Sequence, residues 1–569
     1  MNVSEAIVAI LAESGVEHVF GLPGDTGMAF YDALYHNEGR IQHIMTRDER
    51  SASFMADAYA RVSGKLGVCE GPSGGGATYI VPGVAEAHGS CLPLLCLTSD
   101  TPIREDGRGV LTELNQPALF APITKWSARL TTAATAPDVI RRAVRLATTD
   151  RPGAVALSMP ADVLSAAVDE RDVYGTPEYM FAPANRARPD ADAVQRAADR
   201  VRAARRPVIV AGGGVLISRA WDALTVFAEA GSIPVGTSIN GKGSIAETHP
   251  LSLGVVGGNG ARPYANAVVA GCDLLFLIGT RTDSTTTLNW QLPPRYPAPR
   301  VIHIDVDAWQ IGNNYRTEVG LLADARSALT DLSSALGTLT PDADRLSWLE
   351  QIAVDKRAYF DAQQAFMQSD SQPIKPQRVI ATLKRLVDMH NTVLVADPGT
   401  PTPYIAAQYE LPQPGRWTCI PRAHGGLGYA LPAVVGAHYG RPGSRIVGLM
   451  GDGSFGMSVG ELETITRLKL PITLIQFNNA AFGWIKELQH LYHDNRYFSV
   501  DFNPVDYAAI ARGFGLQAWQ VRDPAELEKT LRAALEDGGP CFVDVVTESQ
   551  ITETPPVHAW LDAEASRRA

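Results

Sequence analysis

The sequence predicts an α/β protein of three consecutive domains, each with a central, mostly parallel sheet flanked by helices. Short apolar runs alternate with helical patterns along the chain, which is the pattern of strands joined by crossover helices. The length of 569 residues also exceeds what one hydrophobic core usually organises. We expect the domains to cover residues 1–165, 186–340 and 370–550.

In the first domain, strands are expected at the apolar runs 18–22, 92–99 and 154–160. The pattern ends near Val163. A Pro- and Ala-rich passage at 176–192 then breaks the alternation, which is typical of an exposed connection between domains.

The second domain repeats the alternation, with strands expected inside residues 206–217, 272–280 and 301–307. It closes near Gly337, and a charged helical segment from Asp342 to Met367 follows. The strands of the third domain are expected at 392–399, 445–453, 471–479 and 540–546.

Composition excludes several classes of protein. Apolar residues make up 45% of the chain and charged residues 20%, as in soluble globular proteins. The formal net charge of -11 argues against binding nucleic acid or anionic membranes, which requires clustered Lys and Arg. The six scattered cysteines match no zinc or disulfide spacing and indicate a reducing compartment. Without a signal-peptide pattern or a membrane-spanning apolar run, we expect a cytoplasmic protein.

A polar motif follows each of two strands expected in the third domain. Gly451-Asp452-Gly453 ends one strand, and Asn479 ends the next. Ligands bind at the carboxyl ends of parallel strands, so the Asp452 carboxylate, the Asn479 amide oxygen and the backbone carbonyl of Ala481 would converge on one cation. Oxygen ligands of this kind suit Mg²⁺, and the two glycines would let a diphosphate approach the backbone. The alternative is a tight turn beside a solvated Asn pair.

The stretch GDGSFGMSVGELETITRLKLPITLIQFNN resembles the thiamine-diphosphate motif of the superfamily of acetohydroxyacid synthase, pyruvate oxidase and benzoylformate decarboxylase. The segments GVEHVFGLPG, RDERSASFMADAYARVSGKLGV, VIHIDVD and GGLGYALPAVVGA extend the resemblance over nearly the whole chain. It implies an N-terminal pyrimidine-binding domain, a central domain, a C-terminal diphosphate-binding domain and an active site between two subunits. A homodimer is then the minimum, and a homotetramer is the expected assembly. The cofactor-binding residues that the resemblance implies are Gly399, Thr400, Gly425, Leu427, Gly451, Asp452, Gly453, Ser454 and Asn479.

The resemblance assigns a catalytic role to Glu49. In this family a carboxyl at that position hydrogen-bonds N1′ of the aminopyrimidine ring of the cofactor. A buried carboxyl with a raised pKa would pass its proton to N1′ and help to activate C2 of the thiazolium ring. The alternative is that Glu49 is one of several solvated charges in the run from Arg47 to Arg50.

Leu427 resembles the bulky apolar residue that wedges between the two rings of the cofactor. Such a wedge would hold the cofactor folded and so favour an internal proton transfer. The resemblance also implies that the Gly425 carbonyl accepts from the N4′ amine, and that the loop around Gly399 and Thr400 receives the diphosphate. The alternative is an ordinary core leucine beside a glycine turn.

The departures from the family bear on the substrate. Leu111-Thr112 stand where acetohydroxyacid synthases have Phe-Gln, Thr285 replaces their carboxylate-binding Arg, and Leu488 replaces their selective Trp. Without the Arg fork, acetolactate formation loses support. Pro72 stands where benzoylformate decarboxylase has its first pocket histidine.

Three further residues are pocket candidates: Gln116, His88 and His424, with His424 the best placed of them. Each is otherwise explained by local hydrogen bonds. The central segments AGGGV and HIDVD resemble a nucleotide-binding remnant that holds FAD in some relatives, but a lone glycine run does not by itself predict FAD.

The sequence thus predicts a 2-oxo acid decarboxylase or carboligase that uses thiamine diphosphate and Mg²⁺ and acts on a small 2-oxo acid, aldehyde or ketone. One alternative is a C–C hydrolase or acyltransferase acting on a diketone or a sulfoaldehyde-like substrate. The other is a non-catalytic homologue, which should have lost Glu49 or Asp452.

Overall fold

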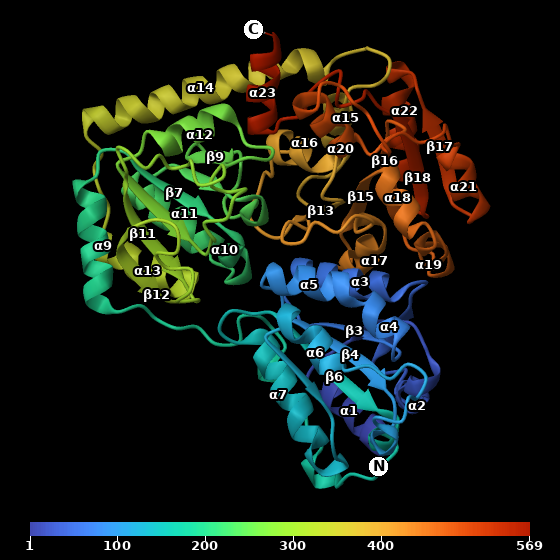
Figure 1. Cartoon of the computed structure of the whole chain (residues 1–569). Coiled ribbons are helices and arrows are strands. Elements are labelled where there is room, and N and C mark those ends of the chain that lie inside the picture. The colour runs from blue at the N-terminus through green and yellow to red at the C-terminus, as the bar shows by residue number, and fades with distance from the viewer. Residues whose placement is uncertain (569) are drawn as a thin grey trace. The chain divides into compact units, whose positions relative to one another are not determined.

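The computed structural model describes residues 1–568 and contains three six-stranded sheets in succession (Figure 1). Each sheet is parallel and is flanked by helices, which confirms the predicted α/β class of three consecutive domains.

The first sheet has the order β2-β1-β3-β4-β6-β5. Its strands are β1 (His18–Gly21), β2 (Gln42–Met45), β3 (Gly67–Gly71), β4 (Leu94–Asp100), β5 (Trp126–Arg129) and β6 (Ala154–Pro160). In the register of the two long strands, Leu94 lies opposite Ala154 and Asp100 opposite Pro160. Strands β3, β4 and β6 are buried throughout, so they are apolar runs without alternation.

Two helical layers cover this sheet. One apolar core lies between the sheet and the helices α1 (Val3–Glu13), α2 (Met28–His36) and α7 (Ala136–Thr148). Helix α3 (Glu49–Ser63) contacts β3 and β1, and α5 (Val81–Gly89) packs against α3. Helix α3 is buried on nearly all sides, which fits its Ala- and Ser-rich sequence.

The middle sheet has the order β12-β11-β10-β7-β8-β9, which is the doubly wound order of nucleotide-binding folds. Its strands are β7 (Pro207–Ala211), β8 (Val235–Thr237), β9 (Ser252–Val255), β10 (Leu274–Ile278), β11 (Arg300–Asp305) and β12 (Thr317–Leu322). Helices α9 (Ala191–Ala203), α11 (Trp221–Gly231) and α13 (Ala325–Leu336) share one core with it. A second core includes residues of α12 (Pro263–Ala270) and α14 (Ala343–Met367).

The third sheet has the order β14-β13-β15-β16-β18-β17, which repeats the order of the first sheet. Its strands are β13 (Thr392–Ala396), β14 (Thr418–Cys419), β15 (Arg445–Gly451), β16 (Ile472–Asn478), β17 (Gln517–Val521) and β18 (Cys541–Val546). The associated helices include α15 (Pro376–Leu386), α16 (Pro401–Gln408), α18 (Asp452–Ser458), α20 (Gly483–Tyr492), α21 (Tyr507–Gly513) and α22 (Pro524–Glu536). The shared order of the first and third sheets means that both present the same switch point, where the strand order reverses.

By contacts, the chain divides into two compact units. The first unit is Met1–Asn185, Pro421–Ile446 and Met457–Ile472, and the second is Arg186–Ile420, Val447–Gly456 and Thr473–Ala569. Helix α17 (Ala430–Gly440) therefore belongs by contacts to the first unit, where it packs against α3.

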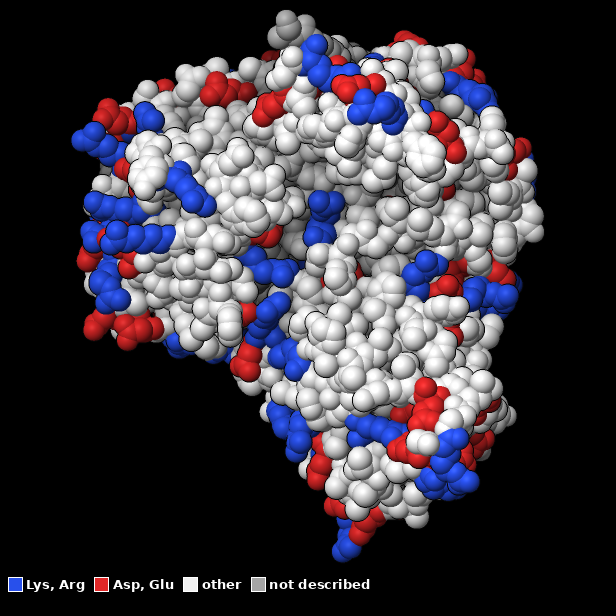
Figure 2. Space-filling model, viewed as in Figure 1, with Lys and Arg blue, Asp and Glu red and all other residues white. Residues whose placement is uncertain are grey.

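Acidic and basic side chains are interspersed on the face of the molecule that Figure 2 shows. Within residues 1–568, no helix combines the length and apolar character that a membrane span requires. The six cysteines, all within residues 1–568, form no disulfide with one another.

Candidate active site

Three loops meet the carboxyl ends of β13, β15 and β16 around the switch point of the third sheet. The turn Asp397–Thr400 follows β13, Asp452 follows β15, and Asn479 follows β16. Because β13, β15 and β16 are neighbours, these loops open on one edge of the sheet. All of them lie in the second unit.

Asp452 lies in a nest of backbone amides. Its carboxylate accepts from the backbone N–H of Gly453 at 2.8 Å and from that of Asn479 at 3.2 Å, and only 3% of the residue is exposed. Burial raises the pKa of Asp452 to about 6, although these N–H groups act to lower it. A buried carboxylate with no basic side chain among its described hydrogen-bond partners is a group that a cation would stabilise.

The two asparagines after β16 have different surroundings. Asn478 donates to Asp544 at 3.1 Å and accepts from the N–H of Ala480 at 3.2 Å, so both ends of its amide are engaged. The Oδ1 atom of Asn479 is buried and has no hydrogen-bond partner among the described residues. The structure therefore leaves the oxygen of Asn479, and not that of Asn478, available for a ligand.

The structure also shows the surroundings of the other residues near Asp452 and Asn479. The carbonyl of Ala481 accepts from the N–H of Gly483 at 2.8 Å and keeps a second lone pair. A Cβ on Gly451 would meet open space, whereas one on Gly453 would lie 2.7 Å from the ring of Phe482. Ser454 is buried in α18. Gly451 thus leaves room beside Asp452, and Gly453 is also required by the packing of Phe482.

The turn after β13 presents Thr400 at the N-terminus of α16. The Gly399 carbonyl accepts from Thr402 at 3.1 Å and closes the turn. The Thr400 side chain does not cap its own helix. The helix dipole favours an anion at this end of α16, but Pro401 and Pro403 have no N–H to donate, so the Thr400 side chain is the polar group that this end presents.

These residues fit a magnesium-bound diphosphate. Among residues 1–568, no three His, Cys, Asp or Glu side chains gather as a metal site. The donor set is instead one carboxylate, one orphaned amide oxygen and a backbone carbonyl, beside a helix N-terminus. Mg²⁺ commonly takes one or two carboxylates and completes its shell with phosphate oxygens and water, which such a set permits.

The second part of the candidate site lies in the first unit, at the N-terminus of α3. Glu49 is the first residue of α3, and the Asp48 side chain caps the helix by accepting from the N–H of Arg50 at 2.7 Å. Glu49 is 7% exposed and lies against Gly71 and Gly76, where an added Cβ would come within 3.3 Å and 3.0 Å of its side chain. Burial raises the pKa of the Glu49 carboxyl above its ordinary value. Glu49 is therefore not the solvated charge of the alternative interpretation, and its role as a proton relay stays a prediction.

The loop that carries Gly425 and Leu427 is held by a carboxylate that sequence reasoning missed. Glu86, on α5, accepts from the backbone N–H groups of Ala423 at 3.1 Å, His424 at 2.7 Å and Gly425 at 3.2 Å. Burial would raise the pKa of Glu86, but Arg61 and these N–H groups hold it below its ordinary value. No local sequence signal pairs a helical Glu with a loop more than 330 residues away.

The same loop enters α17 through a fixed backbone. Gly425 has φ +70 and Gly428 has φ +80, values that favour glycine, and Leu427 lies half-buried between them. After the loop, Tyr429 hydrogen-bonds Asp57 on α3. Gly436 packs on the backbone of Met55, leaving no room for a Cβ.

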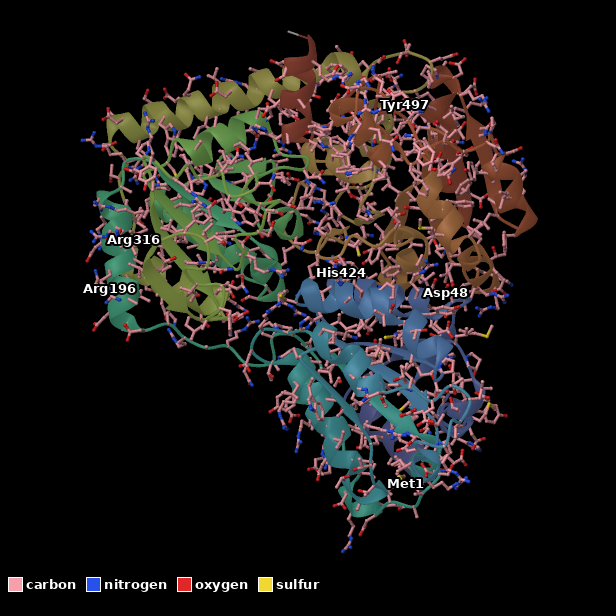
Figure 3. All side chains as sticks on the ribbon, viewed as in Figure 1. Met1, Asp48, Arg196, Arg316, His424 and Tyr497 are labelled. Carbon is pink, nitrogen blue, oxygen red and sulfur yellow. The ribbon has the colours of Figure 1, made fainter. Side chains whose placement is uncertain are left out.

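Glu49 is the first residue of α3, whereas this loop lies near later residues of the helix. Phe54 lies 3.2 Å from a Cβ position on Gly426, and Arg61 pairs with Glu86 at 3.5 Å. Phe54 and Arg61 are roughly 8 and 18 Å from Glu49 along the helix axis, at 1.5 Å per residue. Figure 3 labels Asp48, beside Glu49, and His424, and the two lie apart in that view. Within one chain, therefore, Glu49 is displaced along α3 from Gly425 and Leu427.

The three pocket candidates differ in burial and in hydrogen bonding. Gln116 is fully buried, donates to the Ser99 carbonyl at 2.9 Å and accepts from the Thr98 hydroxyl, so both ends of its amide are engaged. His424 is exposed, and its backbone N–H is the group held by Glu86. His88 is half-buried near Gly153. The geometry of Gln116 favours the local hydrogen-bond alternative.

The structure also shows the surroundings of the residues that depart from the acetohydroxyacid synthase pattern. Leu111 is 85% exposed, and the Thr112 hydroxyl lies 2.8 Å from that of Ser73. The Thr285 carbonyl accepts from Gly258 at 2.7 Å. Leu488 packs against the cluster of Leu491, Val557 and Trp560, the last of which lies in the C-terminal helix α23 (His558–Arg568).

Comparison with known proteins identifies the three domains. Residues 1–119 match the thiamine pyrophosphate enzyme N-terminal TPP binding domain, residues 194–332 the central domain, and residues 397–545 the C-terminal TPP binding domain.

Curated relatives match over nearly the whole chain. The probable acetolactate synthase large subunit of Methanocaldococcus jannaschii is 35% identical over 561 residues, covering 96% of this chain and 92% of that protein. That of Methanococcus aeolicus is 32% identical, covering 98% and 94%. The acetolactate synthase isozyme 3 large subunit of Escherichia coli K12 is 31% identical, covering 96% and 94%. With three domain models matched in order and relatives aligned end to end, the chain belongs to the thiamine pyrophosphate enzyme family.

Proposed function

We propose that this enzyme binds thiamine diphosphate through Mg²⁺ and forms or cleaves a C–C bond next to the carbonyl of a small 2-oxo acid, aldehyde or ketone. The observation that carries the proposal is the pair formed by buried Asp452 and the orphaned Asn479 oxygen, at the switch point of the third sheet and in the same unit as the N-terminus of α16.

In this proposal Asp452, Asn479 and the Ala481 carbonyl hold the cation, and the turn of Gly399 and Thr400 holds the diphosphate together with Gly451 to Ser454. When bound, thiamine diphosphate supplies a carbon nucleophile and an electron sink for the carbonyl substrate. The protein's part is to bind and orient it, and to hold or move protons at defined atoms.

Glu49 is proposed to hold a proton for N1′ of the aminopyrimidine ring. A buried carboxyl with a raised pKa keeps its proton at neutral pH more readily than an exposed one, so it is suited to this exchange. Gly425 would accept from N4′ through its carbonyl, and the half-buried Leu427 would separate the two rings.

A second copy of the chain is proposed to complete each site. Glu49 and Gly425 are assigned to the same pyrimidine ring, and the resemblance of the sequence to the family implies an active site between two subunits. One cofactor would therefore take Glu49 from one subunit and the loop from its partner. This supports a homodimer as the minimum assembly, with a homotetramer as the proposed full assembly.

The substrate is best described by class. A decarboxylase or carboligase is proposed first, because the relatives named as acetolactate synthase large subunits align over nearly the whole chain. A C–C hydrolase or acyltransferase is the second candidate. Thr285 in place of the Arg fork removes a group that would fix a second 2-oxo acid, and this favours the second candidate. A non-catalytic role is disfavoured because Glu49 and Asp452 are both retained and buried.

Calorimetry with thiamine diphosphate and Mg²⁺ tests the proposal, followed by product analysis on a panel of 2-oxo acids, aldehydes and diketones. The visible absorbance of the purified enzyme reports whether FAD is present. We predict that Asp452→Ala abolishes Mg²⁺-dependent cofactor binding, because it removes the only carboxylate assigned to the cation. Asp370→Ala is the control, since Asp370 is exposed in the same unit. Wild-type affinity in Asp452→Ala would place the cation elsewhere.

A further inference from the structure

Gln550 reaches the candidate diphosphate site from a segment that sequence reasoning did not assign. It lies after β18, is 1% exposed, and its amide nitrogen donates to the Thr400 hydroxyl at 3.0 Å. Thr400 and Gln550 are 150 positions apart in the chain. This buried contact lies at the N-terminus of α16 and involves the Thr400 hydroxyl.

The contact fixes the direction of the Thr400 hydroxyl proton. A hydroxyl has one proton to donate and two lone pairs. The Gln550 amide occupies one lone pair, and among residues 1–568 the Thr400 hydroxyl donates to no carbonyl or carboxylate. That proton is therefore left to donate to a ligand at the end of the helix.

The amide oxygen of Gln550 lies near Gly483. It is buried and is left without a hydrogen-bond partner by the part of the chain that the structure describes. A Cβ on Gly483 would lie 2.6 Å from the amide nitrogen of Asn479 and 3.1 Å from the Gln550 oxygen. The side chains of Asn479 and Gln550 therefore lie beside the same glycine, and each ends in an orphaned oxygen.

The segment that carries Gln550 is pinned down on both sides. Backbone bonds join Ile374 to Val546 at 3.1 Å and Glu548 to Ile374 at 2.9 Å. Lys375 pairs with Glu548 at 2.7 Å and also with Glu553. These contacts, on either side of Gln550 in the chain, restrict where its side chain can lie.

We propose that Gln550 is a positioning residue for the diphosphate: it holds the Thr400 hydroxyl so that its proton points at the phosphate, and it closes the site beside Asn479. This inference rests on the proposed function. The alternative is that Gln550 only stabilises the fold. In that case the effect of its substitution on cofactor affinity would not depend on Thr400.

The test is a double-mutant cycle of Gln550→Leu and Thr400→Val, read by calorimetry with Mg²⁺ and thiamine diphosphate and, separately, with Mg²⁺ and inorganic pyrophosphate. Gln550→Leu should weaken both affinities by about 5- to 50-fold, the range for losing an orienting buried hydrogen bond. In the Thr400→Val background it should cause little further loss. Gln550→Glu should be worse than Gln550→Leu, because a carboxylate would draw the Thr400 proton toward itself and repel the phosphate.

The matched control is Gln408→Leu. Gln408 is also a buried glutamine, at the far end of α16, and its amide donates to Gln363 at 3.1 Å. It should leave both affinities unchanged. Additive losses in the cycle, or wild-type affinity in Gln550→Leu with circular dichroism showing an intact fold, would overturn the assignment of Gln550. Absence of binding by the wild-type enzyme would instead refute the proposed function.

Discussion

At the residue scale, Glu49 is assigned to activation of the cofactor and not to its binding. Its carboxyl lies at the N-terminus of α3, in the first unit, while the residues assigned to the diphosphate lie in the second. A substitution that keeps its shape should therefore leave the diphosphate anchor intact.

We predict that Glu49→Gln binds thiamine diphosphate normally but exchanges the C2 proton of the cofactor about 10²–10⁴-fold more slowly, the usual cost of losing a general acid–base group. Hydrogen–deuterium exchange at C2, followed by NMR, measures this without a substrate. Glu38→Gln, at an exposed position, should exchange at the wild-type rate. Wild-type exchange in Glu49→Gln, with cofactor bound, would assign the relay to another carboxyl.

Glu70 is a second buried carboxyl in the first unit, and it makes a pH-dependent contribution to stability. It is fully buried on β3 and accepts from the Tyr31 hydroxyl, which lies 3.2 Å from His43. Burial raises the pKa of Glu70 to about 8 from an ordinary 4.5, although the Tyr31 hydrogen bond lowers it. Because the folded pKa exceeds the unfolded one, the stability due to protonated Glu70 is complete below about pH 4.5 and is lost as the pH rises to about 8.

Glu70→Gln should remove this loss, because the amide keeps the shape and cannot ionise. The melting temperature of the variant relative to wild type should therefore rise between about pH 5 and about pH 9. Thermal unfolding followed by circular dichroism at several pH values gives the difference. A difference that stays constant over this range would mean that Glu70 ionises normally in the fold.

At the element scale, α17 and α3 pack through small residues. Gly436 contacts the Met55 backbone and Gly440 approaches Tyr59, so the helices come close enough to hold the Tyr429–Asp57 contact. Helix α3 begins with Glu49, and α17 follows the loop of Gly425 and Leu427. This packing thus fixes how two parts of the candidate site are spaced within a chain.

We predict that Gly436→Ala lowers the free energy of unfolding of the first unit by about 1–3 kcal/mol, the usual cost of overpacking. Helix propensity alone predicts the opposite sign, since Ala is better than Gly in a helix by about 1 kcal/mol. Gly513→Ala, where a Cβ meets open space at the end of α21, is the control and should be neutral or stabilising. Equal unfolding midpoints in urea for both variants would show that the helices can separate at no cost.

At the scale of the whole molecule, a site shared by two copies has a distinct signature. A mixed dimer of one Glu49→Gln chain and one Asp452→Ala chain would contain one site with both substitutions and one site with neither. If chains pair at random, about a quarter of all sites should be intact in an equal mixture.

Refolding the two variants together should therefore restore rapidly exchanging cofactor to about a quarter of the wild-type amount. The readout is again C2 proton exchange, and each variant alone is the control. Failure to recover any rapid exchange, with mixed dimers demonstrated by differently tagged chains, would place Glu49 and Asp452 in the same subunit's site.

The sequence alone determined the fold class and the positions of Asp452 and Asn479. Both depend on local pattern: apolar runs of strand length predict a parallel sheet, and polar residues at strand ends converge because the carboxyl ends of parallel strands share one edge. Glu49, Gly425 and Leu427 came from resemblance to a family, and their roles remain predictions.

Only the tertiary structure decided which buried groups are engaged and which are left without partners. It engages both ends of the Asn478 amide and leaves the Asn479 oxygen orphaned, engages Gln116 inside the fold, and brings Glu86 to loop 423–425 and Gln550 to Thr400. Apart from the local contact of Asn478 with Ala480, these contacts join residues from 17 to 339 positions apart. Such pairings follow from how whole elements pack, so no local spacing or periodicity in the sequence could have predicted them.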